Sequence, residues 1–115
     1  MMIKNKNERT NFSKLIYVSH PFCGNEKNVE LIELKVKKLR EMHPNYLFVS
    51  PVHTFGYLYS ETSYEEGIDM CLRLLETCDE VWIISKYYDN SKGCLIERSY
   101  AHSIGVPVFN LDLDI

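Results

Sequence analysis

VWII, at residues 81–84, is the most strand-like stretch of the sequence, because it joins β-branched and aromatic residues with no polar residue among them. A second apolar run without polar alternation, LIYV, lies at residues 15–18. Runs of this kind are typical of parallel strands that helices cover on both faces. The sequence therefore predicts a parallel sheet with buried central strands.

Helical and strand-like patterns alternate on either side of these two runs. We predict helices over residues 26–42 and 64–77 and a third helix that Gly105 ends, with further strands over residues 46–50 and 106–111. An aromatic loop is expected over residues 52–62. The resulting β-α-β-α-β-α-β order predicts an α/β fold, a doubly wound (flavodoxin- or Rossmann-like) parallel sheet of four to five strands with helices on both faces.

The chain length of 115 residues fits one domain. Residues 1–13 are rich in Asn and Lys with little apolar content, so we expect a flexible N-terminal tail and a single domain over residues 14–115. A content of 45% hydrophobic and 25% charged residues is ordinary for a globular protein and argues against disorder.

Charge and cysteine content narrow the class of partner. A formal net charge of −3 and a pI near 5.8 argue against a nucleic-acid binder. No apolar run has the length of a membrane span, and the polar start lacks a signal-peptide core, so we expect a cytoplasmic protein without membrane contact. The four cysteines form no C-x-x-C pair, so we expect reduced thiols and neither a zinc knuckle nor a thioredoxin motif.

Ligands of doubly wound folds bind beyond the carboxyl ends of the strands, which directs attention to the loops at residues 20–25, 51–62 and 86–93. The sequence has no G-x-G-x-x-G, no Walker-type phosphate loop and no G-x-S-x-G. Dehydrogenase, P-loop ATPase and serine-hydrolase functions are therefore excluded.

The strongest candidate for chemistry is a carboxylate. Glu97 falls in the first turns of the third helix, after Ser91 and Gly93, where the helix dipole and free amides favour an anion or a ligand phosphate. The alternative is an ordinary solvated helix carboxylate.

Several stretches together resemble one protein superfamily. Residues 91–101, SKGCLIERSYA, followed by GVPV at 105–108, resemble the signature of the nucleoside 2-deoxyribosyltransferase superfamily. LIYVS at 15–19 and CDEVW at 78–82 resemble two of its strands, so the resemblance covers about residues 14–111. The stretch at 71–82 is most similar to a small phage and bacterial branch of that superfamily.

The resemblance implies a nucleoside or nucleotide N-glycosidase or deoxyribosyltransferase that needs no metal or cofactor. Glu97 would be the nucleophile that attacks the anomeric carbon, and water or a second base would complete a retaining displacement. Tyr17 would orient Glu97, or else it is a core aromatic residue. Asp69 would protonate the leaving base, or else it is an exposed helix residue.

The resemblance also implies a set of substrate contacts. Ser91 stands where transferases have an aspartate and is similar to the phosphate-binding serine of the nucleoside 5′-monophosphate N-glycosidases, which favours a nucleotide. A histidine in the first loop would suit a phosphate when protonated, although a loop histidine is more often solvated or capping. The expected substrate-binding residues are Ser19, His20, Phe22, Gly24, His53, Ser91 and Gly93.

The aromatic residues Phe55, Tyr57, Tyr59 and Tyr64 either stack a base, pack against another subunit or form a hydrophobic patch that their own loop covers. Members of the superfamily share sites across subunits, so we expect a homo-oligomer, either a dimer or a tetramer. The competing function is a non-catalytic nucleotide-binding module that sequesters or senses a nucleotide signal.

Overall fold

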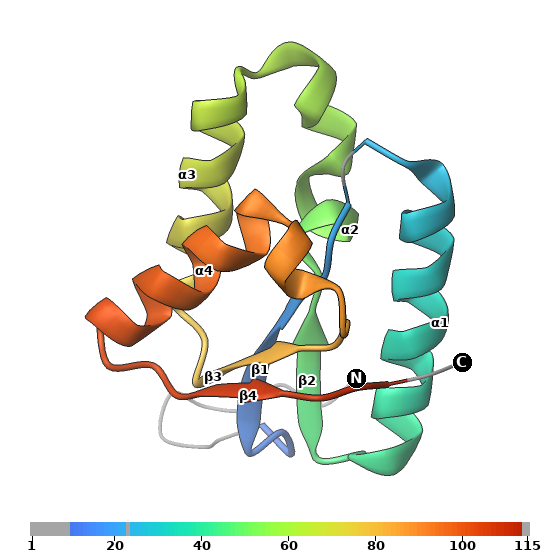
Figure 1. Cartoon of the computed structure of the whole chain (residues 1–115). Helices are drawn as coiled ribbons and strands as arrows, with labels where there is room; N and C mark the ends of the chain where they lie inside the picture. The colour runs from blue at the N-terminus through green and yellow to red at the C-terminus, as the bar shows by residue number, and fades with distance from the viewer. Residues whose placement is uncertain (1–9, 23, 114–115) are drawn as a thin grey trace.

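The structure, a computed structural model, describes residues 10–22 and 24–113 and contains a parallel sheet flanked by helices (Figure 1). Residues 1–9 of the predicted tail, Cys23 and residues 114–115 lie outside the described part. In chain order the elements are β1 (Lys14–Ser19), α1 (Glu26–Met42), β2 (Tyr46–Val49), α2 (Pro51–Phe55), the 3₁₀ helix η1 (Gly56–Glu61), α3 (Tyr64–Leu75), β3 (Glu80–Ile83), the 3₁₀ helix η2 (Tyr88–Asn90), α4 (Lys92–Ser103) and β4 (Val108–Asn110).

The four strands are all parallel and lie in the order β2-β1-β3-β4. Tyr17 of β1 pairs with Val49 of β2 and with Val81 of β3, which places β1 and β3 in the middle of the sheet. Figure 1 shows α1 on one side of the sheet and α3 and α4 on the other. This arrangement confirms the predicted doubly wound α/β fold.

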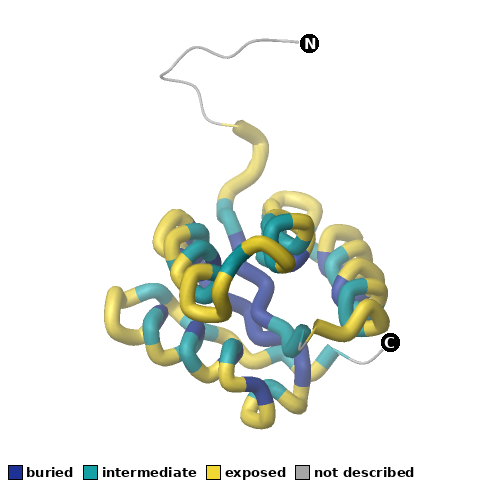
Figure 2. The backbone as a smooth tube through the Cα atoms, turned by 90° about the horizontal axis from the view of Figure 1, so that it is seen from above, coloured by how far each residue is buried: buried dark blue, intermediate teal, exposed yellow. Residues whose placement is uncertain are grey.

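Alternate residues of the central strands point into two different cores, because side chains alternate between the faces of a strand. The core under α3 and α4 contains Tyr17, Cys71, Leu75, Cys78, Val81, Ile83 and Ala101. The core under α1 contains Ile16, Val18, Leu39, Trp82 and Ile84. Both faces of β1 and β3 are therefore covered, which explains their unbroken apolar sequences, and Figure 2 shows these buried strands between helices with exposed outer surfaces.

The single tryptophan, Trp82, lies on the α1 side among His43, Tyr46 and Phe48. Its indole Nε1 donates to Glu80 Oε1 at 2.9 Å. Trp82 is only 7% exposed, so its polar N–H has a partner where water is excluded.

The prediction of an aromatic loop over residues 52–62 is wrong, because this segment forms α2 and η1. Pro51 stands at the first helical position, where its missing N–H is not needed and its fixed φ angle suits a helix. The carbonyl of Ser50 accepts hydrogen bonds from both the amide and the hydroxyl of Thr54. The other predicted elements are present, with ends that differ by up to two residues.

The amino ends of the long helices lie at the carboxyl edge of the sheet. Asn25, Ser63 and Ser91 cap α1, α3 and α4, each by accepting a hydrogen bond from a backbone amide in the first turn. At the far end of α4, Gly105 has a φ angle of +78°, a conformation that favours glycine and ends the helix as predicted. None of the helices in the described part of the chain has the length and apolar content of a membrane span.

Candidate active site

A cavity of about 740 Å³, here called the main cavity, lies at the carboxyl edge of the sheet. Its walls come from the end of β1 and the loop after it, from the start of α2, from η1 and α3, and from the first turns of α4. The predicted site residues His20, Phe22, Gly24, Ser91, Gly93 and Glu97 line it. All three loops to which the sequence directed attention, at residues 20–25, 51–62 and 86–93, contribute described residues to these walls.

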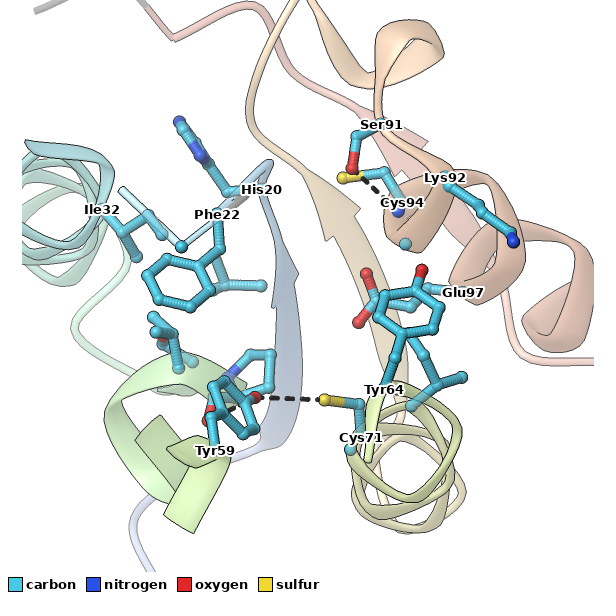
Figure 3. Close-up of a pocket in the computed structure, with 18 of the residues that line it drawn as sticks. His20, Phe22, Ile32, Tyr59, Tyr64, Cys71, Ser91, Lys92, Cys94 and Glu97 are labelled. Atoms are coloured by element: carbon cyan, nitrogen blue, oxygen red, sulfur yellow. Dashed lines mark hydrogen bonds between the residues drawn. The ribbon is translucent and has the colours of Figure 1, made fainter. Parts of the chain in front are cut away.

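Glu97 is 7% exposed and its carboxylate faces the main cavity (Figure 3). One carboxylate oxygen accepts a hydrogen bond from the hydroxyl of Ser19 at 2.9 Å, and the other accepts one from the hydroxyl of Tyr17. Glu97 is thus a buried carboxylate held by two donors on β1, and the solvated alternative is wrong.

Burial raises the pKa of Glu97 to about 7, and the hydrogen bonds from Tyr17 and Ser19 oppose this rise because they stabilise the ionised form. Both protonation states of Glu97 are therefore populated near neutral pH. Burial also raises the pKa of Tyr17 well above its ordinary value, so Tyr17 remains a hydrogen-bond donor.

Tyr17 and Ser19 do not line the main cavity, yet they are fully buried beside it. The ring of Tyr17 belongs to the core under α3 and α4, while its hydroxyl reaches Glu97. The two interpretations of Tyr17, core aromatic and orienting residue, therefore hold together. Ser19, predicted to bind substrate, instead bonds Glu97.

The start of α4 forms a polar part of the wall. The buried hydroxyl of Ser91 accepts a hydrogen bond from the amide of Cys94 at 3.3 Å. Lys92 lines the same wall, and its Nζ lies 5.5 Å from the centre of the Tyr64 ring. Sequence reasoning missed Lys92, although its place between Ser91 and Gly93 at a predicted helix start was the available signal.

His20 lines the main cavity but is not available as a protonated phosphate contact. Its Nδ1 donates to the carbonyl of Pro21 at 2.8 Å, and its Nε2 lies 3.0 Å from Nζ of Lys35. Burial is the main cause that lowers the pKa of His20, and the positive charge of Lys35 lowers it further. Both ring nitrogens are therefore engaged within the protein.

Asp69 does not line the main cavity, so it is not placed to protonate a base there. Tyr64, Gly67, Ile68 and Cys71 share the face of α3 that lines the main cavity, because residues three and four apart coincide on a helix. Asp69 lies outside this spacing and lines a separate cavity of about 570 Å³.

His53 does not line the main cavity either. It is exposed on α2, and its Nδ1 lies 2.8 Å from the hydroxyl of Ser50. The residues just before it, Ser50, Pro51 and Val52, line the main cavity instead.

The predicted aromatic cluster divides into two parts. Tyr59 and Tyr64 line the main cavity, whereas Tyr57 is 79% exposed and Phe55 lines the separate cavity with Asp69. The Tyr59 ring lies 5.9 Å from that of Phe22. The main cavity therefore has an aromatic wall, in which the planes of these two rings are inclined by 41°.

The three described cysteines, Cys71, Cys78 and Cys94, are buried and form no disulfide. Burial raises the pKa of Cys71 and raises that of Cys78 to about 11, so both stay protonated and are poor nucleophiles. The hydroxyl of Tyr59 lies 3.4 Å from the sulfur of Cys71, and Figure 3 marks this hydrogen bond with a dashed line. In the described ranges no three His, Cys, Asp or Glu side chains are placed to hold a metal ion.

Fold and site together define a small α/β protein with a buried carboxylate in a cavity at the carboxyl edge of its parallel sheet. A family model described as "Domain of unknown function (DUF4406)" matches residues 14–110, and the chain belongs to this family. No curated protein matches the chain at a significant level.

Proposed function

We propose that the protein is a nucleoside or nucleotide N-glycosidase, or a deoxyribosyltransferase, in which Glu97 is the nucleophile. The observation that carries the proposal is the position of Glu97: its carboxylate is almost fully buried, yet it faces an open cavity of about 740 Å³. Resemblance to the nucleoside 2-deoxyribosyltransferase superfamily around residues 91–108 supports the same role. A cavity of this size suits a small molecule.

In the proposed reaction the ionised Glu97 attacks the anomeric carbon of the sugar, and the carbon–nitrogen bond breaks with its electron pair leaving on the base. The product is a glycosyl ester of Glu97. Water then displaces the carboxylate in hydrolysis, or a second base does so in transfer. The hydrogen bonds from Tyr17 and Ser19 fix the carboxylate during both steps.

The walls of the main cavity support a nucleotide as substrate. Phe22 and Tyr59 offer flat surfaces for the base. Ser91 and the first amides of α4 suit a phosphate, and Lys92 adds a positive charge there. The remaining cavity wall beside Glu97 would receive the sugar.

A non-catalytic nucleotide-binding module is the second candidate, and one observation favours it. Among the described residues that line the main cavity, Glu97 is the only carboxylate. A departing base therefore has no second carboxylic acid to protonate it. A bound nucleotide would then stay intact.

Incubation with a panel of nucleosides and 5′-monophosphates, followed by chromatography of the released base, tests the enzymatic proposal. Base release by the wild type and by the exposed control Glu65→Gln, with none by Glu97→Gln, supports it. Binding of an intact nucleotide that is as tight in Glu97→Gln as in the wild type, without release, favours the binding module. The absence of both base release and nucleotide binding would contradict both proposals.

We also propose that the protein is a homo-oligomer, a dimer or tetramer. Both edge strands carry exposed large apolar side chains, Leu47 on β2 at 44% and Phe109 on β4 at 49% exposure. Light scattering in solution tests this proposal. A single species of the monomer mass, 13.5 kDa, at all concentrations contradicts it.

A further inference from the structure

Lys35 is a buried lysine on α1. It is 6% exposed, whereas Lys37 and Lys38 on the same helix are exposed. Lys35 shares its helix face with Ile32 and Leu39, which are also buried. Burying a lysine costs free energy unless its ammonium group is hydrogen-bonded, so Lys35 needs acceptors inside the protein.

The head of Lys35 joins two segments at the carboxyl edge of the sheet. Its Nζ donates to the carbonyl of Ile84, just after β3, at 3.0 Å, and to Nε2 of His20, just after β1, at 3.0 Å. A lysine ammonium group can only donate, so Nε2 accepts and the ring proton sits on Nδ1. This Nδ1–H in turn donates to the carbonyl of Pro21 at 2.8 Å.

We propose that Lys35 is a positioning residue for the main cavity: through His20 it fixes the loop that carries Phe22 into the cavity wall. The same loop is tied to the start of α1 through the Phe22 carbonyl. This carbonyl accepts one hydrogen bond from the backbone amide of Asn25 and one from the side-chain amide of Asn28, both at 3.0 Å. Figure 3 shows the His20 ring turned away from Glu97 while the Phe22 ring lies at the cavity.

Lys35 and Glu97 make different side-chain contacts. Glu97 is held by the hydroxyls of Tyr17 and Ser19, whereas the ammonium group of Lys35 donates to His20 and to the carbonyl of Ile84. Loss of Lys35 therefore loosens the aromatic wall and leaves the carboxylate in place. The inference goes beyond the proposed reaction, because a binding module needs the same wall.

The substitution Lys35→Met removes the hydrogen-bonding head and keeps the length of the side chain. Lys38→Met is the matched control, because it changes an exposed lysine of the same helix. Proton NMR contacts between the Phe22 and Tyr59 rings, expected in the wild type at a centroid distance of 5.9 Å, report the wall directly. We expect these contacts to persist in Lys38→Met and to be lost in Lys35→Met.

Ligand affinity provides the second measurement. For whichever substrate the panel identifies, Lys35→Met should raise KM about ten-fold and leave kcat within two-fold, because the wall contributes to binding alone. If no compound turns over, equilibrium binding of adenosine 5′-monophosphate serves as the probe, with an equal loss of affinity expected. The ring contacts test Lys35 even where catalysis fails, so the two proposals fail separately.

Unchanged ring contacts with unchanged KM or affinity in Lys35→Met overturn the proposal. A fall in kcat at constant KM overturns it too, because that result would place Lys35 in the chemical step. If Lys35→Met does not fold, His20→Ala removes the acceptor while leaving the contact between Lys35 and Ile84. The same loss of ring contacts and affinity is then expected, and wild-type behaviour of His20→Ala refutes the role of Lys35.

Discussion

Replacing Glu97 by glutamine should stabilise the protein, and the gain should grow as the pH rises. In the unfolded chain the pKa of a glutamate is near 4.5, whereas burial raises the pKa of Glu97 in the folded protein to about 7. Between these values the folded state binds more protons than the unfolded state, so the free energy of unfolding of the wild type falls as the pH rises. Its contribution is complete below pH 4.5 and lost above pH 7.

The size of this loss in the free energy of unfolding follows from the difference between the unfolded and folded pKa values of Glu97. A difference of one pKa unit corresponds to about 1.4 kcal/mol, so the loss amounts to about 3 kcal/mol over the whole window. Glutamine has nearly the same shape and does not titrate, so Glu97→Gln escapes this loss. The stability difference between variant and wild type should therefore increase by about 2–3 kcal/mol from pH 5 to pH 8.

Urea denaturation followed by far-ultraviolet circular dichroism at several pH values between 5 and 8 measures this difference. Glu65→Gln, which changes an exposed carboxylate on α3, should show a nearly constant difference from the wild type. A Glu97→Gln curve parallel to that of the wild type at every pH would refute the reasoning, because it would mean that Glu97 titrates at its ordinary value when folded.

Four further outcomes are expected. Tyr17→Phe keeps the buried ring and removes the hydrogen bond to Glu97. The value of kcat/KM should therefore fall about ten-fold or more, and the acidic limb of the pH–rate profile should move to higher pH. An acidic limb that does not move contradicts the orienting role of Tyr17. Lys92→Ala should raise KM for 5′-monophosphates and not for nucleosides, and equal effects on both would argue against a phosphate near α4. Asp69→Asn should keep kcat within two-fold, since Asp69 lies outside the main cavity, and a large loss would reinstate it as the acid. Leu75→Ala should lower the free energy of unfolding by about 2–5 kcal/mol in urea titrations, because Leu75 is fully buried in the core; a loss below 1 kcal/mol would show that the core closes around the gap.

The fold was predictable from the sequence because its main elements carry strong patterns. The unbroken apolar stretches at residues 15–18 and 81–84 follow from strands covered on both faces. α2 and η1 were missed, because five and six residues are too few to show helical periodicity. Aromatic residues and a proline in so short a segment are equally compatible with a loop.

The site was predictable in part. Glu97 and Ser91 follow from a helix start at the carboxyl edge of the sheet, a rule that needs only the order of elements. Asp69 was suggested by the family resemblance alone, and the residues of α3 that line the main cavity leave it on another face of the helix. Lys35 was overlooked as one lysine among several, although its spacing from Ile32 and Leu39 puts it on the buried face.

The position of Trp82 has a practical consequence for measuring this protein. It is the only indole of the chain, it packs on the α1 side of the sheet, and it does not line the main cavity. Its fluorescence should therefore follow global unfolding with little interference from bound nucleotide. Conversely, quenching on addition of a nucleotide would indicate that occupancy of the cavity is transmitted to the core under α1, which contains Trp82.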